Sequence, residues 1–291
     1  MGKRRRALVR FKHRCEYWVA RFFVICCRTL PRFAALGLGR TVGVLAWVCS
    51  TTSRRHAESA VAHVAASTDR LEPVTTVKRC FRHYGSALSE AVRLNKGVPP
   101  ITWHGIQHLD SARRRGRGVI LVTGHLGNWE VAATGLGAIG RPITLVVAGM
   151  HNPMVDDLVT SIRRESGVEV IERRQLRQAA RKLERGEVVG TAADQHPVGR
   201  SVQVNFFGEP IEAAIGPAWL THRTGAPLMS LFAPRVENGS YRVDIRPVWD
   251  GDSPLPSVEH LSQVWMGRLE AYVTRYPTQW LWMHRRWREK T

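Results

Sequence analysis

Apolar residues follow two kinds of pattern along the chain. In the first, Phe81, Tyr84, Leu88 and Val92 recur at helical spacing, which predicts a helix over 77–92 with one face toward a core. In the second, which follows it, short continuous apolar runs alternate with helical stretches. A short apolar run without alternation is typical of a strand buried on both faces of a sheet.

The second pattern predicts a parallel sheet with helices on both faces. We expect strands over 119–122, 143–147, 168–171, 188–192, 228–232 and 241–245. We expect helices over 128–136, 153–165, 176–185, 217–224 and 258–276. The pair Asn238-Gly239 precedes the last strand and is a typical hairpin turn. The expected fold class is therefore α/β, with a single sheet domain flanked by helices over 51–291.

The amino-terminal region, 1–50, has a different composition. It is basic at its start and strongly apolar from Tyr17 to Val48, with interruptions at Arg21, Arg28, Pro31, Arg32 and Arg40. No charge-free run approaches the ~18 residues of a confident transmembrane helix. We expect two amphipathic helices at a membrane surface, with the basic flank in the cytoplasm. A single tilted span, or packing against the protein's own core, is the alternative.

The balance of charge adds a constraint on the partners. The chain has 43 Lys and Arg residues against 24 Asp and Glu residues, a formal net charge of +19. Such an excess favours nucleic acid, acidic lipid surfaces, phosphorylated substrates or an acidic carrier protein. A basic nucleic-acid-binding protein is the alternative from another class, but no familiar nucleic-acid module is present. We therefore expect a membrane partner and no nucleic acid.

The candidate chemistry lies where the first buried strand ends. His125 follows Gly124 directly, and Glu130 comes five residues after His125, inside the next predicted helix. In open α/β sheets this carboxyl edge is where ligands bind. Histidine is suited to take a proton from an attacking hydroxyl, and a carboxylate on its other ring nitrogen fixes the tautomer. We therefore predict that His125 and Glu130 form a catalytic pair; a structural histidine beside a surface glutamate is the alternative.

Two further features of this segment matter. Gly127 lets backbone or substrate approach closely, and the amide groups of the helix that starts near Asn128 could stabilise an oxyanion. The chain has no H-E-x-x-H or Cys/His ligand spacing, so we expect no metal and no cofactor. Five cysteines without C-x-x-C spacing favour a reducing compartment.

The segment GHLGNWE over 124–130 resembles the H-x4-[D/E] box of the glycerolipid acyltransferase superfamily. Its glutamate and flanking residues are similar to those of the lipid A biosynthesis (lauroyl/myristoyl) acyltransferase family. The resemblance extends to other landmarks in the same order: Leu30-Pro31, Arg117 to Ile120, Arg163, Gly186 to Val189, Asp194-Gln195, Phe206 to Gly208, Gly225 to Pro227 and Pro277 to Trp287.

This resemblance implies a glycerolipid-acyltransferase-like sheet and direct acyl transfer without a covalent enzyme intermediate. The implied donor is acyl-carrier protein or acyl-coenzyme A, and the implied acceptor is a membrane glycolipid such as a lipid A precursor. A lysophospholipid or a phosphatidylinositol mannoside is the alternative acceptor. His125 would be the general base and Glu130 its orienting partner, while Arg163 and Asp194 would bind substrate or maintain the site. The expected location is the cytoplasmic face of a bacterial inner membrane, by peripheral, monotopic or single-pass attachment.

Overall fold

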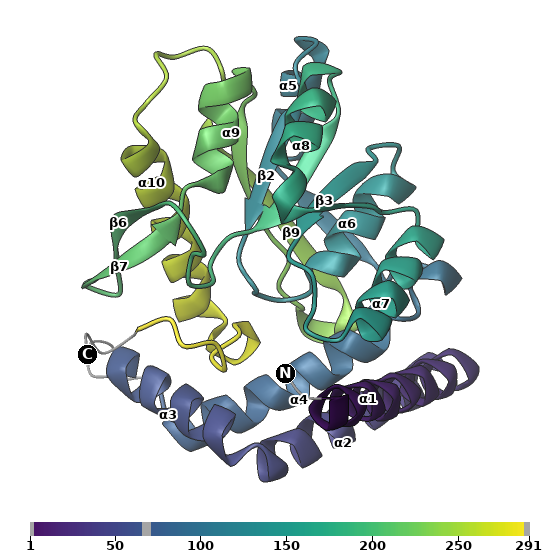
Figure 1. Ribbon diagram of the computed structural model, residues 1–291. Coiled ribbons are helices and arrows are strands. Elements are labelled where there is room, and N and C mark those ends of the chain that lie inside the picture. Colours follow the sequence, from purple (N-terminus) through teal and green to yellow (C-terminus); the bar gives the residue numbers. More distant parts are fainter. Residues whose placement is uncertain (1–2, 66–70, 288–291) are drawn as a thin grey trace.

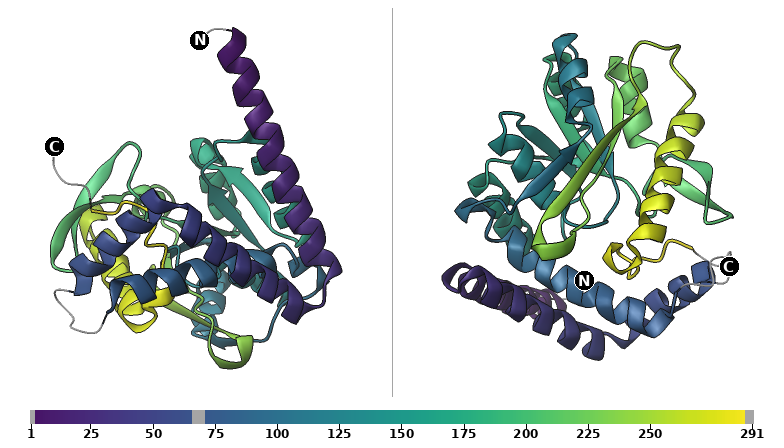
Figure 2. Two further views of the ribbon diagram at one scale, coloured as in Figure 1. Left: turned by 90° about the horizontal axis from the view of Figure 1, so that it is seen from below. Right: turned by 180° about the vertical axis from the view of Figure 1, so that it is seen from behind.

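The computed structural model describes residues 3–65 and 71–287 of the chain. Its first part is a layer of four helices that lies beneath the sheet in Figure 1. These helices are α1 (Lys3–Thr29), α2 (Arg32–Cys49), α3 (Thr51–Ala65) and α4 (Pro73–Ala91). In Figure 2, α1 projects beyond the rest of the molecule at its amino-terminal end.

The prediction of two helices within the first 50 residues is confirmed. They are separated at Pro31, which has extended backbone angles and precedes the first residue of α2. A proline lacks a backbone N–H and disfavours helical angles in the residue before it, so α1 ends at Thr29. The helix predicted over 77–92 lies within α4, whose first turn is capped by the Glu72 carboxylate.

The second part is a seven-stranded sheet with the order β1-β9-β8-β2-β5-β3-β4. All neighbouring strands are parallel except β8 and β9, which form the predicted antiparallel hairpin. The strands of this sheet are β1 (Ile101–His104), β2 (Val119–Thr123), β3 (Ile143–Val147), β4 (Glu169–Glu172), β5 (Val188–Ala192), β8 (Leu228–Phe232) and β9 (Tyr241–Trp249). A separate hairpin consists of β6 (Ser201–Phe206) and β7 (Glu209–Ala214).

Helices cover both faces of the sheet, which confirms the predicted α/β class (Figure 1). The helices of this part are α5 (Ile106–Arg114), α6 (Trp129–Ala138), α7 (Pro153–Glu165), α8 (Leu176–Glu184), α9 (Gly216–Thr224) and α10 (Val258–Arg275). Short 3-10 turns are η1 (Leu94–Lys96), η2 (Arg173–Gln175), η3 (Glu237–Gly239) and η4 (Pro277–Gln279).

The continuous apolar runs have the predicted structural cause. Ile120 and Val122 of β2 pack in one cluster with α8, α9 and α10, whereas Leu121 packs in another with α5 and α6. Successive side chains of a strand point to opposite faces, so a strand covered on both faces needs an apolar residue at every position. All five residues of β2 are accordingly buried.

The layer of amino-terminal helices is fixed to the sheet domain. Gly39 of α2 and Gly85 of α4 face each other so closely that a Cβ on Gly39 would lie 2.2 Å from the carbonyl oxygen of Gly85. Arg32 of α2 and Arg235 both form ion pairs with Glu90 of α4, which is 3% exposed. Among the described residues, α2 alone is long and apolar enough to span a membrane, by length and composition only.

Candidate active site

His125 lies directly after β2, at the carboxyl edge of the sheet, and its partner comes from the adjacent strand. Asp194 follows the end of β5, and its Oδ1 lies 2.6 Å from Nδ1 of His125. The backbone N–H of His125 donates to Oδ2 of the same carboxylate at 2.8 Å. Two contacts from one carboxylate fix both the main chain and the ring of His125.

The remaining partner of Asp194 comes from the carboxyl-terminal tail. Trp280 donates its indole N–H to Oδ2 of Asp194 at 2.8 Å, and a β-bridge joins Trp280 to Leu126. Tyr84 of α4 donates its hydroxyl to the carbonyl oxygen of His125. The buried carboxylate thus accepts three hydrogen bonds, which offsets the free energy lost when its charge leaves water.

These contacts set the titration of the pair. Burial alone would lower the pKa of His125, but the charge and hydrogen bond of Asp194, with the charge of Glu130, outweigh burial and raise it. Burial would raise the pKa of Asp194, yet His125 and the Trp280 indole hold it below its ordinary value. Asp194 is therefore a carboxylate near neutral pH, placed to stabilise a protonated His125 ring.

The predicted hydrogen bond between Glu130 and His125 is not present. Glu130 instead forms an ion pair with Arg163 of α7, with 2.6 Å between Nη2 and Oε1, and Nε of Arg163 donates to both carboxylate oxygens. The indole N–H of Trp129 donates to the same carboxylate, and the Trp129 ring lies edge-on to His125 at 4.8 Å. The carboxylate that is near in sequence thus holds α6 to α7, while the one from β5 holds the His125 ring.

The other residues of the motif have structural contacts. Gly127 has a φ of +69°, and a Cβ there would lie 1.9 Å from the carbonyl oxygen of Ala233. Asn128 caps α6 by accepting from the Val131 amide, and its side chain donates to a carbonyl of α4. The amides of Gly127 and Asn128 donate to protein carbonyls, so neither is free to bind an oxyanion. Trp129 and Glu130 carry the other amides of the first turn.

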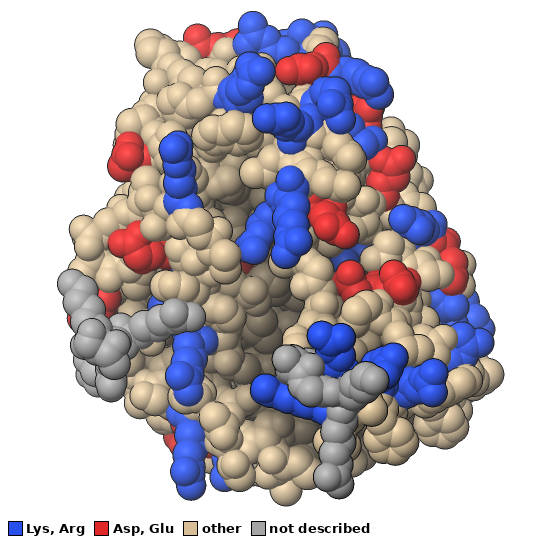
Figure 3. Space-filling view, in the orientation of Figure 1, with Lys and Arg blue, Asp and Glu red and all other residues tan. Residues whose placement is uncertain are grey.

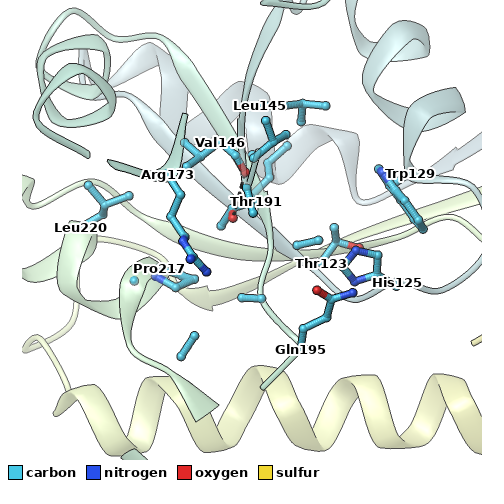
Figure 4. Close-up of a pocket in the computed structure, with 18 of the residues that line it drawn as sticks. Thr123, His125, Trp129, Leu145, Val146, Arg173, Thr191, Gln195, Pro217 and Leu220 are labelled. Carbon is cyan, nitrogen blue, oxygen red and sulfur yellow. Dashed lines mark hydrogen bonds between the residues drawn. The ribbon is translucent and has the colours of Figure 1, made fainter. Parts of the chain in front are cut away.

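A cavity of about 970 Å³ opens beside His125. Figure 3 shows a hollow between the sheet domain and the helical layer, and Figure 4 shows His125 and Trp129 at one wall of the cavity. Much of its lining is apolar and comes from α6, the sheet and α9: Leu121, Ala132, Ala133, Leu136, Ile143, Leu145, Gly190, Leu220 and Leu231. Of the weaker candidates, Arg163 lines the cavity, whereas Gly127, Asn128 and Asp194 do not.

The arrangement combines a histidine, a buried carboxylate hydrogen-bonded to its ring and an apolar cavity. Among the residues that the structure describes, no group of three or more His, Cys, Asp or Glu side chains could hold a metal ion. Sequence reasoning missed Trp280 and Tyr84 as partners of the pair. The sequence indicates Trp280 as part of a family landmark and as a tail tryptophan suited to a membrane interface or to core packing, and Tyr84 as a member of an apolar helix face.

Comparison with known proteins gives the family. The chain matches the bacterial lipid A biosynthesis acyltransferases over residues 4–289. It is 27% identical over 188 residues to the phosphatidylinositol mannoside acyltransferase of Mycobacterium tuberculosis, covering 63% of this chain and 58% of the relative. It is 28% identical over 191 residues to the lipid A biosynthesis lauroyltransferase of Escherichia coli, covering 64% of this chain and 61% of the relative.

A second Escherichia coli protein, the lipid A biosynthesis palmitoleoyltransferase, is 27% identical over 195 residues, covering 65% of this chain and 62% of the relative. The chain thus spans about three-fifths of the length of the curated relatives it matches. The match to the family itself extends over nearly all of the sequence. The chain therefore belongs to the bacterial lipid A biosynthesis acyltransferase family.

Proposed function

We propose that this protein transfers a fatty acyl group from a carrier thioester to a hydroxyl of a membrane glycolipid. The observation that carries the proposal is the His125–Asp194 pair at the wall of a large, mainly apolar cavity, in a chain of this family. The donor is acyl-carrier protein or acyl-coenzyme A. The cavity is suited to an acyl chain because apolar groups gain free energy when they leave water.

The proposed mechanism is direct transfer with general-base catalysis. Nε2 of His125 takes the proton of the acceptor hydroxyl as its oxygen attacks the thioester carbonyl, and Asp194 on Nδ1 stabilises the imidazolium. The tetrahedral intermediate then expels the thiolate, which receives the proton back from His125. No serine or cysteine is among the described residues that line the cavity. The two threonines of the lining, Thr123 and Thr191, donate their hydroxyls to backbone carbonyls and not to His125, which supports a route without an acyl-enzyme.

The amino-terminal helices are proposed to attach the protein to the membrane surface. Leu8, Phe11, Trp18, Phe22 and Ile25 recur along one side of α1 and are each at least half exposed. An uncovered apolar stripe with basic neighbours is typical of a helix that lies in the lipid interface. Because one side of α2 packs on α4, we propose monotopic attachment, on the cytoplasmic face of a bacterial inner membrane.

A lipid A precursor is the proposed acceptor, because the chain belongs to the family of lipid A biosynthesis acyltransferases. A phosphatidylinositol mannoside is the second candidate. It is favoured by the similarity to the Mycobacterium tuberculosis protein, whose identity to this chain differs by one percentage point from that of the lauroyltransferase. Both acceptors are phosphorylated membrane glycolipids, so the same base and the same membrane-facing helices serve either reaction.

Product identification tests the proposal. Membranes from cells with and without the protein are incubated with labelled acyl-carrier protein or acyl-coenzyme A, and the lipids are analysed by mass spectrometry. We expect a new acylated glycolipid only where the protein is present. Lipid profiles that do not differ, with protein detected in the membrane fraction, would contradict the proposed transfer.

A further inference from the structure

The cavity rim carries two arginines that the proposed reaction has not used. Arg173 begins η2 directly after β4, and Arg200 lies in the segment between β5 and β6. Both side chains line the cavity, and Figure 4 shows Arg173 and His125 entering it from different walls. Arg173 and Arg200 therefore belong to the same cavity as His125 but lie at a different part of its lining.

Few acidic side chains line the cavity that these arginines share. Arg163, the third arginine of the lining, is compensated by the Glu130 ion pair and by the charge of Asp156. Asp156 is the acidic residue of the lining and also accepts from the Met150 amide. Among the described residues, no ion pair involves Arg173 or Arg200. Both arginines are exposed to solvent, and two guanidinium groups without an ion pair on the lining of one cavity are suited to bind an anion.

The shape and charge of the arginine side chain favour a phosphate group as this anion. The planar guanidinium group matches phosphate oxygens with two parallel hydrogen bonds, and it stays charged at any physiological pH. A phosphate ester in this reaction has two sources, namely the prosthetic arm of the acyl donor and the head of the acceptor glycolipid. Both bring the same group, so the position of the site must decide between them.

The position favours the donor. In the view of Figure 3, basic side chains border the hollow both above and below it, and the layer of α1 to α4 lies below it. Arg173 and Arg200 belong to the sheet domain, in the segments that follow β4 and β5, and not to that layer. If that layer faces the lipid, the acceptor enters from below and a water-soluble donor enters from above. We propose that Arg173 and Arg200 bind the phosphate ester of the donor's phosphopantetheine arm, which acyl-carrier protein and coenzyme A share. This inference rests on the proposed function.

A pair of donors that differ by one phosphate tests the site. Acyl-4′-phosphopantetheine and acyl-pantetheine carry the same thioester, and only the first carries the phosphate. In the double variant Arg173→Gln/Arg200→Gln we expect KM for the phosphorylated donor to rise about tenfold or more, with kcat retained, because charge-assisted hydrogen bonds are lost. KM for acyl-pantetheine should be unchanged, and Arg173→Lys/Arg200→Lys should restore part of the difference.

Arg177→Gln is the matched control, because Arg177 is an exposed arginine of α8 that does not line the cavity. It should leave both KM values unchanged. A rise in KM for the acceptor lipid alone would overturn the proposal by assigning the site to the acceptor's phosphate. Unchanged KM values for all substrates would overturn it as well. Failure of the proposed function is a different result, in which the wild-type protein acylates no lipid from either donor.

Discussion

Asp194 contacts His125 through both the ring and the main chain, whereas Glu130 acts on the ring only by its charge. The two carboxylates therefore have separate tasks. Asp194 orients the ring and stabilises its protonated form. Glu130, through Arg163 and Trp129, fixes the start of α6 against α7 and so holds the aromatic ring beside His125.

The substitution Asp194→Asn should change the pH profile. In the proposed mechanism His125 takes a proton only when its ring is neutral. The value of kcat/KM should therefore rise with pH and level off above the pKa of His125, which is raised above its ordinary value of 6.5. Without the Asp194 charge, burial lowers the pKa with less opposition, and the acid limb should move to lower pH. The plateau should fall about 100-fold or more, because the ring loses its orienting partner.

Initial rates of acyl transfer between about pH 5 and pH 9 measure this shift, within the range where histidine titrates. Glu130→Gln is the comparison, since its charge contributes less to the pKa of His125. It should move the limb less and lower thermal stability through the loss of the Arg163 ion pair. An acid limb at the same pH in Asp194→Asn and the wild type would contradict the assigned role.

The motif alone could not show which carboxylate forms the hydrogen bond to His125. The spacing of His125 and Glu130 places both at the same sheet edge, and that location is as predicted. The hydrogen-bond partner is 69 positions further along the chain than His125. Asp194 meets His125 because β5 lies next to β2 in the sheet. The order of the strands depends on the whole fold, so it cannot be predicted from the spacing of residues within one motif.

At the scale of elements, α6 and the strands beneath it form one wall of the cavity. Ala132 and Ala133 of α6 line the cavity, and larger residues at these positions would fill part of it. Gly190 of β5 also lines the cavity, but the side chains of Ile143 and Leu145 already occupy the space where a Cβ on Gly190 would point. In the proposed function, the volume available to an acyl chain therefore depends on the small side chains of α6.

The substitution Ala133→Leu should favour shorter acyl chains. The added isobutyl group occupies part of the cavity, so kcat/KM for a long acyl donor should fall about tenfold relative to a short one. Competition between donors of different chain length measures the ratio directly. Met150→Leu, at an exposed part of the lining, is the volume-conserving control. An unchanged preference in a folded Ala133→Leu protein would place the acyl chain elsewhere.

The strands that could be predicted best from the sequence are those buried on both faces of the sheet. β2, β3 and β5 are central strands covered on both faces, so their apolar runs are continuous and easy to identify. β1 is a four-residue edge strand whose residues alternate between half-buried and exposed, and it was not predicted. The β6–β7 hairpin, which packs beside α10 outside the main sheet, was also missed for lack of a continuous apolar run.

At the scale of the whole molecule, the helical layer and the sheet domain both contact the His125–Asp194 pair. Tyr84 of α4 binds the carbonyl of His125, and Glu90 of the same helix binds Arg32 of α2. The proposed membrane surface is thus coupled through α4 to the active site. A lipid acceptor in the interface would reach His125 without leaving the membrane completely.

Removal of the exposed aromatic side chains of α1 should release the protein from lipid. The triple variant Phe11→Ser/Trp18→Ser/Phe22→Ser replaces three residues that are each at least 62% exposed, so folding should be little affected. Binding to vesicles with anionic lipid should weaken about tenfold or more, because three apolar side chains no longer enter the interface. Co-sedimentation with vesicles measures this loss.

Val74→Ser, an exposed apolar position in the first turn of α4, is the control and should bind as the wild type does. The triple variant should keep its activity toward a detergent-dispersed acceptor lipid, because the residues around His125 are unchanged. Undiminished vesicle binding by the triple variant would show that another surface, such as the tail around Trp287, holds the protein to the membrane.

The most direct test of the central claim is the rate of acyl transfer by purified His125→Ala. The account predicts that formation of the acylated glycolipid falls about 100-fold to 10,000-fold, since the attacking hydroxyl loses its base. Vesicle binding should be close to that of the wild type, because the exposed side chains of α1 are unchanged. The variant should still unfold in one cooperative thermal transition, at a lower temperature, because the buried Asp194 carboxylate loses the ring hydrogen bond and Trp129 loses its aromatic contact. Acyl transfer by His125→Ala within a few-fold of the wild-type rate would contradict the account.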